Sequence, residues 1–108
     1  MPVRSKLHGM ISLAAKAGKL QSGETAVRAA IQKKQAVMLL ADENASANTK
    51  DTMGKLNTAY ALPLLYVEDL GALIGKPGRT MVALCDAGFA KAIEKIKDES
   101  EHGGVEVE

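Results

Sequence analysis

The sequence predicts an α/β fold, a three-layer α/β/α sandwich around a mixed sheet of about four strands. Two patterns point to this class. Stretches with apolar residues three and four positions apart alternate along the chain with short apolar runs that have polar flanks. One of these runs, residues 36–41, is apolar throughout, as expected of a strand covered on both faces. A sheet with helices on both sides buries such a strand, so the alternation favours a sandwich.

The first half of the chain is expected to contain three helices. The first spans residues 4–18, with Gly18 where a helix-ending glycine belongs. A very short strand or extended link connects it to a second helix, for which Ser22 is the expected N-cap. After the apolar strand, a third helix begins near Ser46 and runs to Tyr60, whose ring is expected on the inner face.

The second half continues the alternation. A strand is expected over residues 64–67, followed by a short helix that stops at Gly75. Residues 76–79 form a turn, and residues 80–85 form the last strand. Asp86 is placed to cap a terminal helix with one buried face. The predicted order is therefore α-β-α-β-α-β-α-β-α.

Composition indicates one domain with an acidic tail. The chain has 108 residues, of which 46% are hydrophobic, enough for a single core. Residues 1–97 hold all 14 Lys and Arg and eight of the 13 acids, a net charge of +6, while residues 98–108 hold the other five acids. We expect the domain to end at residue 97 and the tail to be disordered. The chain has no apolar stretch of signal-peptide or membrane-spanning type, so a cytoplasmic protein is expected.

Catalysis and cofactor binding have little support. Cys85 is the lone cysteine, and neither His8 nor His102 has a reason to lie beside it, so no nucleophilic pair or metal set is expected. The glycine-containing turn 75–80 lacks the spacing and context of a phosphate loop. No small-molecule substrate is indicated either. The three aromatic residues occupy apolar-patterned positions, which predicts no stacking platform.

Binding of an anion is better supported. The start of the second helix, at Ser22 and Gly23, should present free N–H groups and a partial positive charge, with Lys19 and Arg28 on either side. An ordinary cap and turn is the alternative for this pair. A second polar cluster follows the apolar strand (Asn44, Ser46 and Lys50); the alternative for this cluster is helix capping, with Asn44 or Ser46 as the cap of the third helix. A basic turn carries Lys76 and Arg79. Loops that leave strand ends in such a sheet tend to share one edge.

Three segments carry a resemblance to a known family: Ser12 to Arg28 (SLAAKAGKLQSGETAVR), Ala45 to Lys50 (ASANTK) and Leu70 to Arg79 (LGALIGKPGR). In order and spacing they resemble the kink-turn-binding ribosomal-protein superfamily of L-seven-Ae and L-thirty-e, in its small bacterial YlxQ-type branch. The resemblance covers about residues 6–97 and implies an L-thirty-e-like fold that binds structured RNA, ribosomal or otherwise associated with translation, with ribosomal or translation proteins as further partners. The residues it implies at the RNA are Lys19, Ser22, Gly23, Glu24, Thr25, Arg28, Asn44, Ser46, Lys50, Lys76 and Arg79.

One part of the motif differs from the kink-turn binders. They carry an Asn-Glu or Lys-Gln pair followed by Lys three residues later, whereas this chain has Glu24, Thr25 and Arg28. A carboxylate cannot donate a hydrogen bond to a guanine edge. The sequence therefore leaves two hypotheses: a non-catalytic binder of structured RNA, and a protein-interaction module of the same fold whose RNA recognition is weakened or lost.

Overall fold

The computed structural model describes residues 3–103, and its helices and strands follow the predicted order. The elements are α1 (Val3–Lys16), β1 (Leu20–Ser22), α2 (Glu24–Gln32), β2 (Met38–Asp42), α3 (Ala47–Tyr60), β3 (Leu64–Val67), α4 (Leu70–Leu73), β4 (Met81–Leu84) and α5 (Ala87–Gly103). The Asp86 cap is confirmed, because its Oδ1 accepts a hydrogen bond from the Phe89 N–H at 2.9 Å.

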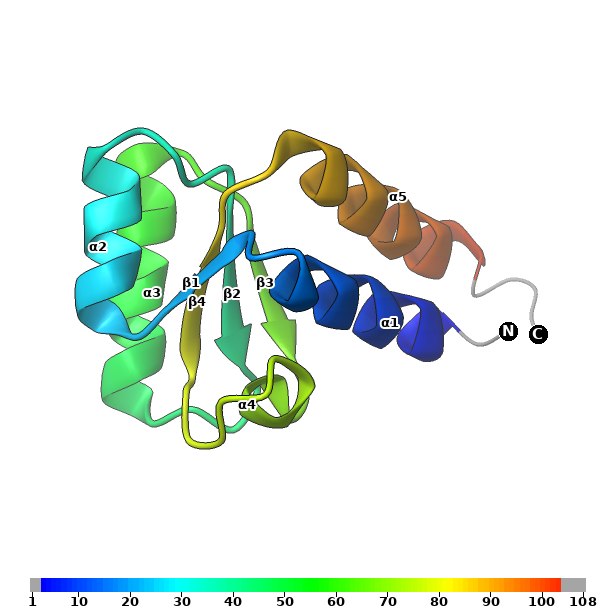
Figure 1. Ribbon diagram of the computed structural model, residues 1–108, viewed down its shortest axis with the longest axis horizontal. Coiled ribbons are helices and arrows are strands. Elements are labelled where there is room, and N and C mark those ends of the chain that lie inside the picture. Colours follow the sequence, from blue (N-terminus) through cyan, green and yellow to red (C-terminus); the bar gives the residue numbers. More distant parts are fainter. Residues whose placement is uncertain (1–2, 104–108) are drawn as a thin grey trace.

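The four strands form one mixed sheet in the order β1-β4-β2-β3. Strands β2 and β3 are parallel, and β4 is antiparallel to both of its neighbours. Strand β4 therefore lies inside the sheet although it is the last strand in the chain, and β1 and β3 form its edges (Figure 1). The predicted fold class is confirmed.

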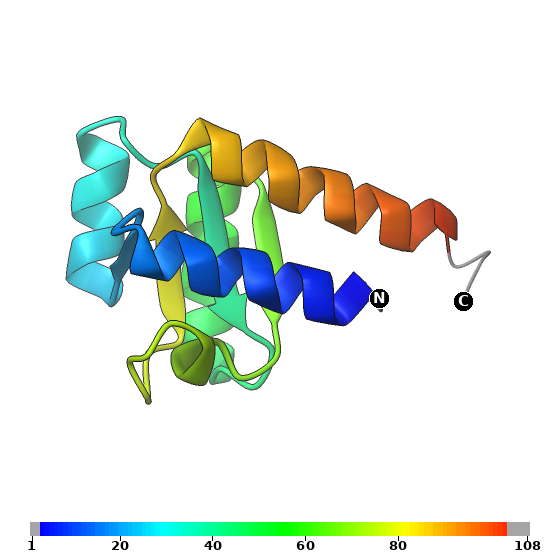
Figure 2. The ribbon, with the colours of Figure 1, turned by 45° about the vertical axis from the view of Figure 1, so that its right-hand side comes forward.

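Helices cover both faces of the sheet (Figures 1 and 2). Along β2, Met38 and Leu40 belong to a core formed with α1, α4 and α5, whereas Leu39 and Ala41 belong to a second core formed with α2 and α3. All four side chains are at most 2% exposed. Full burial of each large side chain contributes about 1.5–3 kcal/mol, so this strand needs a helical layer on each side.

The last helix is longer than predicted. We expected disorder from Asp98 onward, whereas α5 continues to Gly103; the rest of that tail, residues 104–108, lies outside the described residues. Two effects favour the extension. Adding residues to an existing helix costs little compared with nucleating one. Lys6 of α1 also lies 3.7 Å from Glu99, Nζ to Oε1, which links the two neighbouring helices at this point.

The two tyrosines are more exposed than the apolar pattern indicated. Tyr60 is 52% exposed and Tyr66 is 39% exposed. Tyr60 is the last residue of α3, where the helix leaves the core. Tyr66 lies on β3, an edge strand with a neighbour on one side only. The apolar pattern therefore did not predict the exposure of these two rings, whereas Phe89 packs against the core.

Candidate functional site

The predicted segments meet at one edge of the sheet, at the lower side of Figure 1. Strands β2 and β3 end there and β4 begins there; β1, antiparallel to β4, also ends there, with Ser22 opposite Val82. Helices α2 and α3 begin at this edge. We call it the loop edge and define it as residues 22–28, 42–50 and 75–80.

Ser22 does not cap α2. It is the last residue of β1, and the N-cap is Gly23, which makes no side-chain cap bond. Strand pairing holds Ser22 in place, because the Gly23 N–H donates to the Met81 carbonyl at 2.9 Å. Gly23 has φ +96° and ψ 154°, a conformation essentially restricted to glycine. The first N–H groups of α2 are therefore left without a side-chain acceptor at the cap.

The guanidinium of Arg79 lies at this helix start. Its Nη1 donates to the Ser22 carbonyl oxygen at 2.7 Å and to Ser22 Oγ at 3.1 Å. A Cβ added to Gly23 would lie 2.7 Å from the same nitrogen, closer than van der Waals contact allows. The absence of a side chain at position 23 thus lets a fixed positive charge approach the positive end of the helix dipole.

Glu24 and Arg28 form an ion pair on the exposed side of α2. Both Nε and Nη2 of Arg28 lie 2.9 Å from Glu24 Oε2. The side chains remain about half exposed, and Thr25 beside them is also exposed. Arg28 is therefore at the loop edge as predicted, but its charge is compensated by a residue of its own helix.

The start of α3 is built differently. Ser46 is the N-cap; its Oγ accepts a hydrogen bond from the Thr49 N–H and donates to Thr49 Oγ1, both at 3.1 Å. Of the two expected caps, Asn44 and Ser46, it is thus Ser46 that closes the helix. One turn further, Lys50 Nζ lies 5.8 Å from the centre of the Tyr66 ring.

Asp42 organises the loop edge, which the sequence did not indicate. Its Oδ1 accepts from the Asn44 N–H at 2.7 Å, and its Oδ2 accepts from the Leu70 N–H at 3.0 Å. One carboxylate thereby joins the end of β2, the loop before α3 and the start of α4. An aspartate followed two residues later by a loop N–H donor is a common turn arrangement, and this was the available sequence signal.

Gly71 allows the turn with Lys76 and Arg79 to fold against α4. A Cβ at Gly71 would lie 2.9 Å from the Lys76 carbonyl oxygen and within 3.1 Å of two further backbone atoms, Arg79 O and Gly78 N. Backbone atoms cannot move aside as a flexible side chain can. This close packing fixes the position from which Arg79 reaches Ser22.

Lys19 does not join the other predicted residues. Its carbonyl accepts from the Cys85 N–H at 2.8 Å, which places it at the opposite end of β1 from Gly23. In an extended strand the backbone positions of Lys19 and Ser22 are about 10 Å apart. The expectation that Lys19 flanks the helix start was wrong, because residues that are close in sequence lie at opposite ends of even a short strand.

The loop edge carries both signs of charge. Arg28, Lys50, Lys76 and Arg79 supply the cations, while the acids Glu24, Asp42 and Glu43 lie among them. The net positive charge of residues 1–97 is therefore not concentrated here. Recognition of an anion at this edge has to depend on positioned donors more than on an overall field.

Other parts of the described chain offer less chemistry. Burial raises the pKa of the Cys85 thiol above its ordinary value, which keeps it protonated and weakens it as a nucleophile. Among residues 3–103 no group of His, Cys, Asp and Glu is arranged to hold a metal ion. No helix in that range has both the length and the apolar character needed to cross a membrane.

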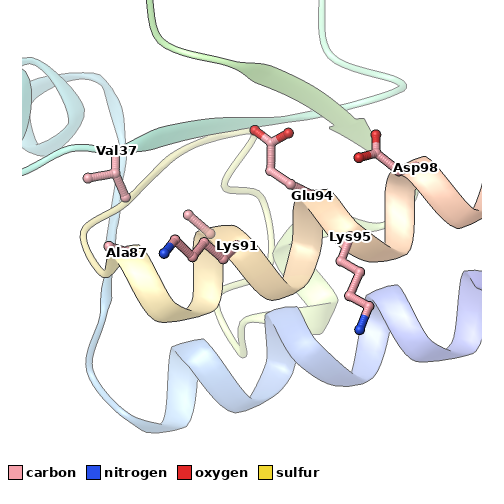
Figure 3. Close-up of a pocket in the computed structure, with 7 residues that line it drawn as sticks. Val37, Ala87, Lys91, Glu94, Lys95 and Asp98 are labelled. Atoms are coloured by element: carbon pink, nitrogen blue, oxygen red, sulfur yellow. The ribbon is translucent and has the colours of Figure 1, made fainter.

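A hollow of about 490 Å³ lies beside α5, between Val37 and Asp98. Figure 3 shows Glu94 and Asp98 projecting from one side of this helix, and Lys95 projecting away from them. The charged groups that line the hollow do not converge on a common point. We therefore do not include it in the candidate site.

Comparison with known proteins gives close matches over most of the chain. No protein-family model matches it. It is 36% identical over 92 residues to a Bacillus subtilis (strain 168) protein named RNA-binding protein YlxQ, covering 82% of this chain and 92% of the relative. A protein of the same name from Enterococcus faecium is 33% identical over 96 residues, covering 86% and 92%.

Two solved structures are similar to the fold. A protein with unknown function from Bacillus halodurans C superposes with a TM-score of 0.79 at 31% identity, covering 87% of this chain and 98% of its own. The Giardia lamblia 15.5kD RNA binding protein superposes with a TM-score of 0.70, covering 93% and 88%. The identity to that second protein is 9%, so it supports the fold alone.

Proposed function

Since the chain belongs to the family of the proteins named RNA-binding protein YlxQ, we propose that it binds structured RNA, without catalysis, through the loop edge. The observation that carries this proposal is the hydrogen bonding between Arg79 and Ser22. These residues are 57 positions apart in the sequence, and they join two of the segments that resemble RNA binders.

A backbone phosphate is the group that fits the start of α2. The open N–H groups and the Arg79 guanidinium supply donors and positive charge at one place. Gly23 has no side chain that would keep a phosphate from the backbone. The exposed lysines of the loop edge, Lys50 and Lys76, are suited to neighbouring phosphates. The proposed contact residues are Ser22, Gly23, Glu24, Thr25, Arg28, Asn44, Ser46, Lys50, Lys76 and Arg79.

The class of RNA that we propose is a kink-turn-like feature of ribosomal RNA, which would give the protein a role in translation in the cytoplasm. A short, exposed edge with scattered hydrogen-bond donors suits a bent RNA backbone better than a long, regular RNA double helix. Because acids lie among the cations, positioned contacts should contribute more than charge alone.

A protein-interaction module remains the second candidate. The Glu24–Arg28 pair favours it, because the arginine already has an anionic partner at 2.9 Å. In that case the loop edge would bind a protein surface with few phosphate-like anions.

Retention on immobilised total RNA at increasing salt separates the two. We expect retention at low salt and release as salt rises, because phosphate contacts release counterions. Lys76→Ala should elute at lower salt than the parent chain, whereas Lys91→Ala, an exposed lysine on α5, should elute with it. A parent chain that is not retained even at low salt would rule out the RNA proposal and favour the protein partner.

A further inference from the structure

We propose that Tyr66 is a stacking platform for an unpaired RNA base, and that Lys50 beside it binds the phosphate next to that base. The inference rests on the proposed RNA binding and extends the site from the loop edge onto strand β3. It is carried by the exposure of the ring, by its position in the sheet and by the contact with Lys50.

Tyr66 lies next to the loop edge. It pairs with Ala41 of β2, and Ala41 is the residue before Asp42. Side chains alternate along a strand, so Tyr66 shares a face with Leu64, which packs in the core beneath α2 and α3. The tyrosine therefore stands on the α3 side of the sheet, at the end where α3 begins.

The ring is accessible because β3 is an edge strand. It is 39% exposed, and Lys50 Nζ lies over its face, 5.8 Å from the ring centre. Lys50 is itself exposed and lies one turn after the cap Ser46. An exposed aromatic ring beside a cation, next to a loop, is the combination with which proteins hold unpaired bases.

A base can take the place that Lys50 occupies over the ring. An exposed contact between an ammonium and a ring is weak, and base–aromatic stacking is the stronger of the two interactions. The long lysine side chain would then turn to the phosphate attached to the stacked base. After this exchange the Tyr66 ring stacks on the base, and the Lys50 ammonium pairs with the phosphate.

Tyr60 provides a matched control. It is more exposed, at 52%, but it is the last residue of α3, ten residues beyond Lys50 and so about 15 Å away along the helix. It therefore lies far from the loop edge. A general affinity of RNA for exposed tyrosines would involve both residues, whereas the proposed platform involves Tyr66 alone.

The first test uses the absence of tryptophan from the chain. In Tyr66→Trp and Tyr60→Trp, each protein has one selectively excited fluorophore. With total ribosomal RNA as the probe, we expect saturable quenching in the Tyr66→Trp protein and little change in the Tyr60→Trp protein. Equal signals in the two proteins, or no change in either while RNA binds, would overturn the inference.

The second test compares Tyr66→Phe with Tyr66→Leu on the same RNA. Phenylalanine keeps the ring, so affinity should stay within about twofold of the parent, whereas leucine should weaken binding by about tenfold. The salt slope should not change in either variant, because no charge is removed; Lys50→Ala should lower it by about one unit. Thermal unfolding of each variant checks that the fold is retained.

The outcomes distinguish this inference from the function on which it rests. If the parent chain does not bind ribosomal RNA, the proposed function fails. If the parent binds and Tyr66→Leu binds equally well, the function stands and the stacking platform is wrong. If Tyr66→Phe weakens binding as much as Tyr66→Leu does, the hydroxyl group and not the ring makes the contact, and the platform is again wrong.

Discussion

Helices α2 and α3 begin at the same edge of the sheet, and their N-termini are capped in opposite ways. At α3, the Ser46 hydroxyl accepts from the Thr49 N–H, so the helix supplies its own acceptor. At α2, Gly23 makes no side-chain cap bond, and the guanidinium of Arg79, from the turn before β4, lies beside it. One helix start is closed and the other is open.

This difference separates stability from binding at the loop edge. A capped start stabilises its helix by about 1 kcal/mol and has less capacity left for an external anion. An uncapped start with a positive charge held beside it gives up that stability and gains an anion site. We therefore expect loss of the Ser46 cap to affect mainly folding, and changes at the start of α2 to affect RNA affinity more strongly.

The largest expected effect comes from blocking the open start of α2 with the methyl group of Gly23→Ala. The conformation at Gly23 should cost a non-glycine residue about 1–3 kcal/mol of folding free energy. The new Cβ would also push Arg79 away, and RNA affinity should fall strongly. Chemical denaturation and RNA titration at fixed salt measure the two quantities.

Gly18→Ala is the control for that variant. Gly18 also has a positive φ, +73°, but its added Cβ would meet nothing within 4 Å. It should lose about 1 kcal/mol of stability and keep its RNA affinity. If both alanine variants lost affinity in proportion to their stability, Gly23 would have a purely structural role.

Opening the closed start is the next largest change. Ser46→Ala removes the acceptor for the Thr49 N–H and should lower the free energy of unfolding by about 1 kcal/mol. RNA affinity should fall much less than in Gly23→Ala, with an unchanged salt slope. A loss of affinity that matches Gly23→Ala would show that the two starts are not functionally different.

A smaller effect is expected from Arg28→Ala. The exposed pair with Glu24 contributes at most a few tenths of a kcal/mol to stability, so folding should hardly change. If Arg28 leaves Glu24 to contact a phosphate, the salt slope should fall by about one unit. Lys19→Ala, at the opposite end of β1, is the matched control and should leave the slope unchanged.

The smallest effect concerns the charge beside the open start. Glu24→Asn frees Arg28 and removes a negative charge from the approach to the helix, so affinity for a kink-turn RNA should rise by about 0.3–1 kcal/mol. Asp51→Asn frees Lys55 in a similar pair on α3, where Nζ and Oδ2 lie 3.1 Å apart, and should bind as the parent does. Unchanged affinity in Glu24→Asn would mean that this carboxylate does not set the RNA preference.

Local sequence patterns predicted the positions of the helices and strands well, but predicted less well which distant segments each of them contacts. The strand Leu64–Val67 lies at the predicted residues, and Ser46 caps α3 as one of two expected residues. Ser22 was assigned to a cap because serine before a helical stretch usually has that role. What decides its position is pairing with Val82, sixty residues later in the chain.

The same limit applies to exposure. Periodicity places Tyr66 on an inward face, but it cannot show that β3 is an edge strand with an open side. Lys19 illustrates the limit for the site, because its distance from Gly23 depends on an extended backbone between them. Contacts between distant segments, such as those of Asp42 with Leu70 and of Arg79 with Ser22, are outside the range of local patterns.

The pairing of β1 with β4 has a consequence for how the protein is made. Strand β1 hydrogen-bonds only to β4 in the described sheet, so it stays without its strand neighbour until Leu84 has been synthesised. Such distant pairing slows folding, because a long loop must close before the contact contributes free energy. The start of α2 acquires Arg79 at that same late moment. A nascent chain on a translating ribosome therefore completes the open helix start only when most of its length has emerged, so the binding proposed at that start would begin only from then on.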